Sequence, residues 1–397
     1  MNRDYPNGWA EFNLNEILDT IENGSRPTGG IKDISDGIPS LGGEHLDPNG
    51  GFKFNNLRLI PKEFYKELKH GKIKKYDVLL VKDGATTGKV SIVDDFFPFD
   101  VAAVNEHLFI LRGKKDMIDQ KFLFYHLLSP FGQRQIENSF HGAAIGGINT
   151  QFIKRYSILL PPLTTQRAIV STLEKSKTLM KLRQKSDKLT TDLLKALFYQ
   201  MFLKKGYETK TLAEICLKIT DGTHRTPMYV SNGVPFLRVT DLTNSNESKK
   251  FISLREHKEL IKRCKPEKGD ILYSKNGTIG IAKLVDWDYE FSIFVSLCLI
   301  KPNNEMILSK YLECFLNTPI ALNQALKHSK TGTITNLHLN QLEKITVPVP
   351  PLELQQKFVK ITKDIENLQK RQSESRNTIS TFFDSLTQNA FNGELIC

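Results

Sequence analysis

The sequence of 397 residues contains nearly the same unit twice. The string PPLTTQRAIV at 161–170 returns as PPLELQQKFV at 350–359, which is 189 residues later. Nearer the start, the separation is 198 residues, as between Gly8 and Gly206. A separation that decreases along the chain indicates one ancestral unit with a few loop insertions. Solenoid repeats have periods of about 20–50 residues, so the sequence predicts a duplicated domain instead of a repeat array.

The composition is that of a folded globular protein. Hydrophobic residues make up 40% of the chain and aromatic residues 9%, values that argue against wholesale disorder. The length is sufficient for two or three domains with their own cores. No stretch approaches the roughly 20 apolar residues of a membrane span, and the first residues lack the apolar core of a signal peptide. We therefore expect a cytoplasmic protein that does not enter a membrane.

Cysteine and histidine spacing gives no sign of a metal centre. The five cysteines all lie in the second half of the chain, without a spacing suited to zinc or to a disulfide framework. The nine histidines likewise keep no metal-ligand spacing. We therefore expect no bound metal in this chain.

The net charge of +11 is distributed unevenly. Residues 163–204 carry nine Lys/Arg and three Asp/Glu, and residues 205–351 carry 20 and 15, whereas the rest of the chain is balanced. Excess positive charge is compatible with a polyanionic partner. Many basic proteins never bind nucleic acid, however, so charge alone does not decide the function.

Each repeat ends in a segment that we expect to form one long helix. The segments, about 163–204 and about 352–392, follow Pro-Pro pairs, and Gly393 is suited to cap the second. Forty residues at 1.5 Å each give about 60 Å of helix. Seam positions spaced alternately by four and three residues, with a polar middle at Gln372 and Arg183, predict an antiparallel coiled coil. The apolar seam positions include Leu179, Leu193, Ile365, Leu368, Phe382 and Leu386. The alternative is a long amphipathic helix lying on its own domain.

The remainder of each repeat is predicted to be a mixed α/β (α+β) domain. YDVLLVKDG at 76–84 and GDILYSKNG at 269–277 read as strands that end in hairpin turns, with return strands at 89–95 and 281–287. We expect further strands at 107–111 and 295–300. The segments 121–130 and 310–319 have helical spacing and stop at a proline.

Catalytic motifs are missing from the sequence. GATTGKV at 84–90 differs from a phosphate-binding loop, because it is one residue short and has Val90 after Lys89. No Gly-x-Gly-x-x-Gly signal indicates a dinucleotide fold, and no tetrapeptide of an amino-methyltransferase is present. We therefore expect no catalysis by this chain.

Three pairs of polar, glycine-rich loops occur at equivalent positions in the two repeats. They are NGSRPTGG and DGTHRTP at 23–30 and 221–227, the two hairpin turns, and HGAAIGGINTQ and KTGTITNLHLNQ at 141–151 and 330–341. Their side chains suit contacts with base edges and phosphates, and glycine permits close approach of the backbone. Each loop alone could be an ordinary turn. A repeated scaffold with differing polar residues favours two readers of different sequences.

These features together resemble the specificity subunit of type I restriction–modification systems, over the whole chain. The resemblance rests on short motifs in a fixed order: Pro161-Pro162-Leu163 with Gln166, Pro350-Pro351-Leu352 with Gln355, Gly8, Trp9, Leu14 and Glu16, the hairpin Gly269–Gly277, and AFNGEL at Ala390–Leu395. It implies two target-recognition domains, 1–160 and 206–349, with pseudo-twofold symmetry. It also implies spacer helices, 161–205 and 350–397, that pair as an antiparallel coiled coil.

The resemblance further implies partners and a division of labour. The chain would read a bipartite target in double-stranded DNA, without catalysis of its own. Two methyltransferase subunits and the restriction/translocase subunits would bind to it, and S-adenosylmethionine, ATP and Mg would be held by those partners only. The alternative hypothesis is a coiled-coil scaffold with two protein-binding modules and no role on DNA.

The predicted site residues follow from these loops and helices. Thr331, Thr333, Asn336 and His338 are expected to read bases, and Lys275 and Lys330 to hold phosphates. The complete set of predicted DNA contacts is Arg26, Thr28, Lys82, Thr86, His141, Asn149, His224, Arg225, Lys275, Asn276, Thr278, Lys330, Thr331, Thr333, Asn336 and His338. The predicted partner contacts are Gln166, Leu179, Leu193, Gln355, Leu368 and Phe382. Asp83, which stands where the second hairpin has Asn276, would repel phosphate.

Overall fold

The chain folds into two compact units. A computed structural model describes residues 8–27, 34–140, 147–244, 248–328 and 336–394. The first unit contains the residues up to Arg183 together with those from Ser375 onward, and the second contains Gln184–Glu374. Both long helices therefore contribute residues to both units. The domain boundaries drawn from the sequence at 160, 205 and 349 stay predictions.

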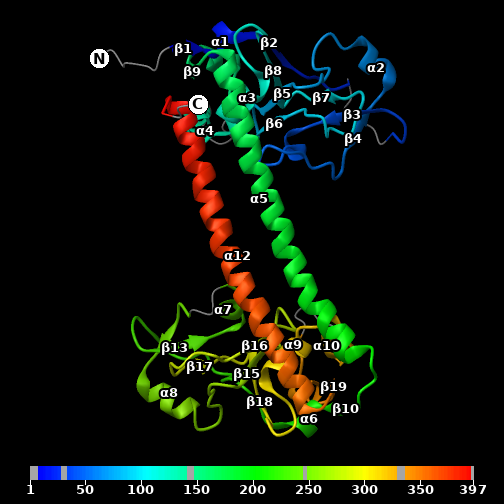
Figure 1. Ribbon diagram of the computed structural model, residues 1–397, viewed down its shortest axis with the longest axis vertical. Helices are drawn as coiled ribbons and strands as arrows, with labels where there is room; N and C mark the ends of the chain where they lie inside the picture. The colour runs from blue at the N-terminus through cyan, green and yellow to red at the C-terminus, as the bar shows by residue number, and fades with distance from the viewer. Residues whose placement is uncertain (1–7, 28–33, 141–146, 245–247, 329–335, 395–397) are drawn as a thin grey trace. The chain divides into compact units, whose positions relative to one another are not determined.

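A four-stranded antiparallel sheet forms the centre of the first unit (Figure 1). Its order is β2-β8-β5-β6, formed by Leu18–Asn23, Leu108–Gly113, Val78–Val81 and Val90–Ile92. A second sheet has the order β4-β3-β7, from Arg58–Ile60, Ile38–Leu41 and Ala103–Val104, and β1 (Ala10–Asn13) pairs with β9 (Ser157–Leu160). The helical elements are α1 (Leu14–Ile17), η1 (Gly43–His45), α2 (Lys62–Glu67), α3 (Gln120–Leu128), α4 (Pro130–Glu137) and η2 (Thr150–Lys154).

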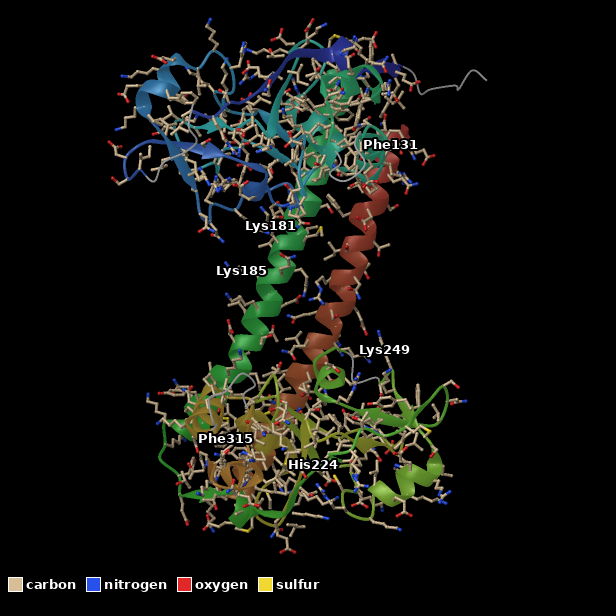
Figure 2. All side chains as sticks on the ribbon, turned by 180° about the vertical axis from the view of Figure 1, so that it is seen from behind. Phe131, Lys181, Lys185, His224, Lys249 and Phe315 are labelled. Atoms are coloured by element: carbon tan, nitrogen blue, oxygen red, sulfur yellow. The ribbon has the colours of Figure 1, made fainter. Side chains whose placement is uncertain are left out.

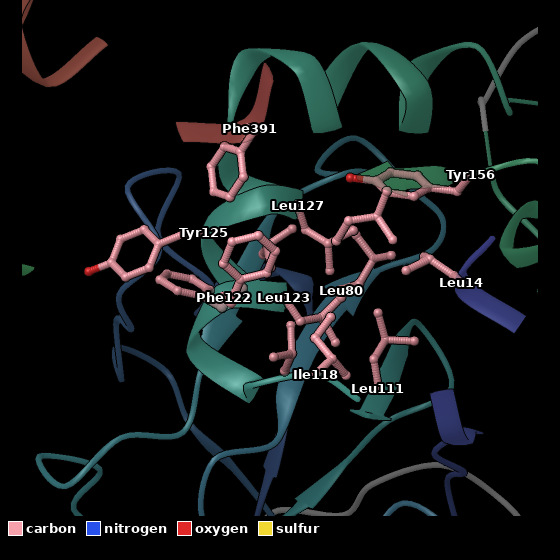
Figure 3. Close-up of a cluster of buried hydrophobic side chains, with 14 of the residues drawn as sticks. Leu14, Leu80, Leu111, Ile118, Phe122, Leu123, Tyr125, Leu127, Tyr156 and Phe391 are labelled. Atoms are coloured by element: carbon pink, nitrogen blue, oxygen red, sulfur yellow. The ribbon is translucent and has the colours of Figure 1, made fainter. Parts of the chain in front are cut away.

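The central sheet is buried on both faces, which explains the unbroken apolar run of β5. Val78 and Leu80 join the larger core, whereas Leu79 and Val81 join a second cluster with Leu108. Successive strand residues point to opposite faces, so a strand covered on both sides needs an apolar residue at every position. Helix α3 covers the face formed by Val78 and Leu80 with residues such as Phe122, Leu123 and Leu127, and Phe391 of α12 (Leu352–Asn392) packs beside them (Figure 3).

The second unit repeats this arrangement. Its central sheet has the order β11-β18-β15-β16, from Cys216–Asp221, Leu297–Pro302, Ile271–Ser274 and Ala282–Leu284. A second sheet, β12-β14-β13-β17, uses Tyr229–Val230, Phe251–Ile252, Val234–Leu237 and Ser292–Ile293, and β10 (Thr209–Thr211) pairs with β19 (Thr346–Pro348). The helices are α6 (Leu212–Ile215), α7 (Val239–Asn244), α8 (Leu254–Leu260), α9 (Ser309–Leu316), α10 (Pro319–His328) and α11 (Leu339–Leu342). The matching strand order confirms the duplication.

The predicted hairpins and helices are confirmed. β5 pairs antiparallel with β6, and β15 with β16, so the strings at 76–84 and 269–277 lead into hairpins. Equivalent glycines stand where each first polar loop begins. A Cβ on Gly24 would lie 1.7 Å from the carbonyl oxygen of Val104, and one on Gly222 would lie 2.1 Å from that of Ile293. Only glycine allows the backbone to approach so closely.

The two long helices are present with nearly the predicted bounds. Helix α5 runs over Leu163–Phe198 and continues as a π-helical turn, η3, through Tyr199–Leu203, while α12 runs over Leu352–Asn392. Gly393 ends α12 with φ of 77°, and the amide of Glu394 donates to the carbonyl of Asn389 at 3.0 Å. This is the six-to-one bond of a Schellman cap, so the predicted glycine cap is confirmed.

Each unit contains the beginning of one long helix and the end of the other, running antiparallel. Ile169 and Leu173 of α5 share the first core with Leu386 and Phe391 of α12. In the second unit, Phe198 of α5 and Phe358 of α12 have ring centroids 5.3 Å apart. The two hypotheses for these helices are therefore both partly correct: each helix lies on its own domain where it begins and packs with the other helix.

The predicted register of the seam is only partly correct. Its polar middle is confirmed, because Gln372 Nε2 donates to Ser186 Oγ at 3.1 Å and to Thr190 Oγ1 at 3.0 Å. Ile365 and Leu386 are buried as expected. The predicted seam residues Leu179, Leu193, Leu368 and Phe382, by contrast, are exposed. A strict heptad drifts by about 20° per seven residues against a straight helix, which moves such positions off the contact face.

Equivalent buried ion pairs secure the two central sheets. The guanidinium of Arg112 donates to Asp77 at 2.7 Å and to Glu22 at 2.8 Å. In the second unit, Lys301 donates to Asp270 at 2.6 Å. Burial raises the pKa of the Asp77 and Asp270 carboxyls, against the opposing effect of their cationic partners. These clusters fix the strands and are not candidates for binding.

His126 makes the first unit sensitive to acid. Its ring is enclosed by Phe391, with centroids 4.9 Å apart, and Nδ1 lies 2.9 Å from the hydroxyl of Tyr156. Burial lowers the pKa of His126 to about 3, compared with about 6.5 in an unfolded chain. Between these values the unfolded state binds the extra proton, so stability is present above about pH 6.5 and is lost as the pH falls.

We expect the unfolding free energy of the first unit to decrease by up to about 1.4 kcal/mol per pH unit below pH 6.5 because of this group. Urea unfolding at pH 7, 6 and 5, monitored by hydrogen exchange in α3, measures the slope. The variant His126→Phe should show a shallower slope. Equal slopes in the two proteins would contradict the assignment.

Candidate nucleic-acid interface

In both units, backbone hydrogen bonds bring the hairpin turn and the third polar loop together. The amide of Leu337 donates to the carbonyl of Lys275 at 2.9 Å, and an isolated antiparallel bridge joins Asn276 to Asn336. The first unit has the same pattern: the amide of Ile148 donates to Lys82 O at 2.7 Å, and Asp83 is bridged to Gly147. This shared frame places the polar residues of loops that are distant in sequence side by side.

In the second unit, the frame surrounds a cavity of about 740 Å³. Five of the predicted DNA contacts line it: His224, Lys275, Asn276, Asn336 and His338. The other lining residues are Asp221, Val295, Leu339, Asn340 and Gln341. His224 lies on this unit in Figure 2. The sequence thus identified residues that the fold brings together, although their contacts with DNA stay predictions.

Asp221 is the electrostatic centre of this cavity. Its Oδ2 lies 2.9 Å from His224 Nε2 and 3.4 Å from Lys275 Nζ. Arg263 forms an ion pair with the other carboxylate oxygen and donates to the backbone carbonyl of Asp221 at 2.9 Å. One buried carboxylate therefore organises three basic side chains, and the cluster has an excess of positive charge whenever Lys275 and Arg263 are charged.

The position of Lys275 contradicts the prediction that it holds a phosphate. Only 5% of its side chain is exposed, and its ammonium group faces Asp221. A buried ammonium needs a counter-charge, and Asp221 supplies it from β11. Lys275 therefore supports the wall of the cavity from within. Arg225 and Thr278, in contrast, are exposed and remain predicted contacts.

The first unit arranges its charges differently. Arg26 Nε lies 2.8 Å from Glu106 Oε1, and His107 Nε2 lies 3.4 Å from the same oxygen. The other ring nitrogen of His107 is in close contact with Asp83. Lys82 lies over the ring of Phe109, 5.5 Å from its centroid. The charged groups of this loop cluster are thus paired with one another.

The remaining predicted contacts have varied environments. Thr86 is half-buried and packs beside Gly43, where a Cβ would lie 2.6 Å from its hydroxyl. Asn149 caps η2 by accepting from the amide of Gln151 at 2.9 Å, which accounts for one lone pair of its side chain. His338 is exposed at the start of α11. Thr28, His141, Lys330, Thr331 and Thr333 lie outside the described residues.

Gln166 and Gln355 are not available to a partner, and their assignment as partner contacts is corrected. Both side chains are fully buried. Gln166 Oε1 accepts from the amide of Asp119 at 2.8 Å, and its Nε2 donates to Met117 O and Pro161 O at 2.9 and 2.8 Å. Gln355 repeats the pattern in the second unit. Gln166 therefore fastens the start of α5 to the loop before α3, and Gln355 fastens the start of α12 to the loop before α9.

The variant Gln166→Met should destabilise the first unit by about 3 kcal/mol, because it leaves one amide and two carbonyls buried without partners. Gln355→Met should have a similar effect that is confined to the second unit. Hydrogen exchange resolved by unit measures both, and each variant serves as the control for the other. A loss below about 1 kcal/mol would contradict the role given to the glutamine.

The other predicted partner contacts are accessible. Leu179, Leu193, Leu368 and Phe382 are each at least 45% exposed. Lys181 and Lys185 project from α5 (Figure 2), in keeping with the basic composition of that segment. These side chains remain predicted contacts for partner proteins.

Four charged residues of these loop clusters were not predicted from the sequence: Asp221, Arg263, Glu106 and His107. Asp221 is the first residue of the loop DGTHRTP. Basic and amide side chains are the ones expected to contact DNA, so an acidic residue there gives no signal of a site. Arg263 follows α8, and nothing in its sequence surroundings connects it with β11. A contact between residues 42 positions apart depends on the tertiary fold.

Two equivalent units, each with polar loops held on a shared frame, define a duplicated recognition protein. Among the described residues, no helix has the length and apolar character to span a membrane. The family described as "Type I restriction modification DNA specificity domain" matches residues 6–191 and 204–379. The chain therefore belongs to this family and carries its domain twice.

Relatives and solved structures are similar over various parts of the chain. The type I restriction enzyme EcoBI specificity subunit of Escherichia coli is 25% identical over 173 residues, which are 42% of this chain and 36% of that protein. A type I restriction enzyme specificity subunit of Haemophilus influenzae is 24% identical over 89% of this chain and 87% of its own length.

A chain from a structure of complex assembly in the type I R-M system has a TM-score of 0.67, with 20% identity, and the match covers 99% of this chain and 100% of that one. The S subunit of a type I restriction–modification system from M. genitalium has a TM-score of 0.54, with 18% identity, over 98% and 97%. At these identities the structures establish the fold. The family assignment identifies the chain as a DNA-recognition subunit and gives no support to the scaffold hypothesis.

Proposed function

We propose that each unit reads one half of a bipartite DNA target. The observation that carries this proposal is the shared loop frame with different side chains: Asn276 faces Asn336 in the second unit, whereas Asp83 faces Gly147 in the first. Bases are discriminated by side-chain donors and acceptors, so equivalent frames with different chemistry suit two different sequences.

We also propose that the chain assembles with partner subunits and is not itself catalytic. The relatives are named as specificity subunits of type I restriction enzymes, and one similar chain comes from a structure of complex assembly in the type I R-M system. By analogy, two methyltransferase subunits and the restriction/translocase subunits would assemble with this chain in the cytoplasm. Methyl transfer and cleavage, with S-adenosylmethionine, ATP and Mg, would then fall to those subunits.

Co-expression with the adenine methyltransferase subunit of the same genome tests this function. We expect sequencing of modified adenines to show one bipartite motif with a fixed gap. Each subunit expressed alone should give no such motif. A single continuous motif, or methylation that does not depend on this chain, would contradict the proposal.

A further inference from the structure

Two carboxamides in the cavity of the second unit have oxygens without a hydrogen-bond donor. Asn276 Oδ1 and Asn336 Oδ1 are buried, and no described residue donates to either. Both side chains are half-buried and line the cavity. A buried acceptor without a donor is costly, so either half-buried side chain would be stabilised by turning its oxygen toward a ligand donor in the cavity.

Resting on the proposed function, we propose that the facing pair Asn276 and Asn336 reads an adenine in the half-site bound by the second unit, with one of the two carboxamides bonded to its major-groove edge. The major-groove edge of adenine carries an amino donor, N6, beside an acceptor, N7. A carboxamide presents an acceptor beside a donor, so it satisfies both atoms at once. A paired adenine has one free N6 hydrogen, so it supplies the donor that one of the two asparagine oxygens lacks.

The other bases match this pair of side chains less well. Guanine offers two acceptors, which require two donors such as a free lysine. Lys275, which lines the cavity, is buried and its ammonium group lies 3.4 Å from Asp221. Cytosine presents a donor with no neighbouring acceptor, and thymine presents an acceptor with no donor. Adenine alone complements both atoms of a carboxamide.

The first unit does not offer the same chemistry at the equivalent position. Asp83 has no donor when ionised, and one of its oxygens is already in contact with His107. Its bridge partner, Gly147, has no side chain. The frame is shared, but the adenine reader is therefore specific to the second unit.

The test uses the assembled complex and a duplex whose target has been defined by methylation mapping. Each adenine of the second half-site is replaced in turn by 7-deazaadenine, which lacks only the N7 acceptor. At fixed salt, one replacement should weaken binding by at least about 5-fold, and by less than the roughly 150-fold upper limit for loss of a whole bidentate contact, because the N6 donor is kept. This measurement needs no variant of the protein.

Variants then connect that position to the asparagines. Asn276→Asp and Asn336→Asp each keep the size of the side chain and remove its donor, so the variant of the asparagine that bonds to the base should weaken binding to the adenine duplex by a similar factor. The 7-deaza replacement should then have little further effect. Asn340→Asp is the matched control, because it adds the same charge at an exposed residue that lines the same cavity; the 7-deaza effect should persist in it.

Two results would overturn the inference while leaving the proposed function intact. One is a bipartite target in which no 7-deaza replacement in the second half-site weakens binding. The other is a 7-deaza replacement that weakens binding to the Asn276→Asp variant and to the Asn336→Asp variant as much as it weakens binding to the unchanged protein. Failure to find any bipartite target would instead contradict the proposed function.

Discussion

Insertion of seven residues into both long helices is expected to widen the gap between the two half-sites by about three base pairs. Seven residues add roughly 10.5 Å of helix, and successive base pairs are about 3.4 Å apart. Seven residues are also close to two full turns, so each helix continues with nearly the same face toward its neighbours. The insertion points are Arg183/Gln184 and Glu374/Ser375, where each helix passes from one compact unit to the other.

Methylation mapping of the co-expressed complex reads the gap directly. The control replaces seven residues around the same points without changing the length, and it should leave the gap unaltered. An unchanged gap in an insertion variant that still methylates DNA would rule out the helices as the determinant of spacing.

Replacement of Asp221 by alanine should destabilise the second unit by about 3–5 kcal/mol. The substitution removes the counter-charge of Lys275, whose side chain is 5% exposed, and an unpaired buried charge is strongly unfavourable. It also frees His224 and Arg263 from the carboxylate that orients them. DNA binding should weaken together with stability, because the wall of the cavity depends on the same group.

Chemical unfolding and a double variant separate these effects. Asp221→Ala with Lys275→Met should recover much of the lost stability, because no buried charge is then left unpaired. The variant Asn23→Ala, at the equivalent position of the first unit, should have a small effect. If the double variant is no more stable than Asp221→Ala, the ion pair is not the cause.

The elements that could be predicted are those whose signal is local. The strands β5 and β15 are predicted by apolar runs that are followed by Asp-Gly or Asn-Gly. Helix α12 is predicted by a long stretch without glycine that ends at Gly393. The duplication strengthens these predictions, because the same element is predicted from two different stretches of sequence. The prediction that Leu179 and Leu193 lie in the seam between the helices is wrong, because their burial depends on how each helix is rotated about its axis in its unit.

The site could be located from the sequence, but its chemistry could not. Glycine-rich loops at equivalent positions identified the cavity that contains Asn276 and His338. The assignment of Lys275 failed because its partner, Asp221, lies 54 positions earlier, and only the pairing of β11 and β18 beside β15 brings them together. Gln166 was misassigned for a similar reason: a polar residue in a first helical turn usually faces water, whereas here the loop before α3 encloses it.

The first unit is made of two segments that are far apart in the sequence, and this has a consequence for biosynthesis. The second unit is one continuous stretch, Gln184–Glu374, whereas the first needs the buried residues Leu386, Ala390 and Phe391 from the far end of the chain. A ribosome releases these residues only after the whole of the second unit. The part of the protein that is made first is thus the last to be completed, and a nascent chain presents an open apolar surface on α3 until synthesis has passed Phe391.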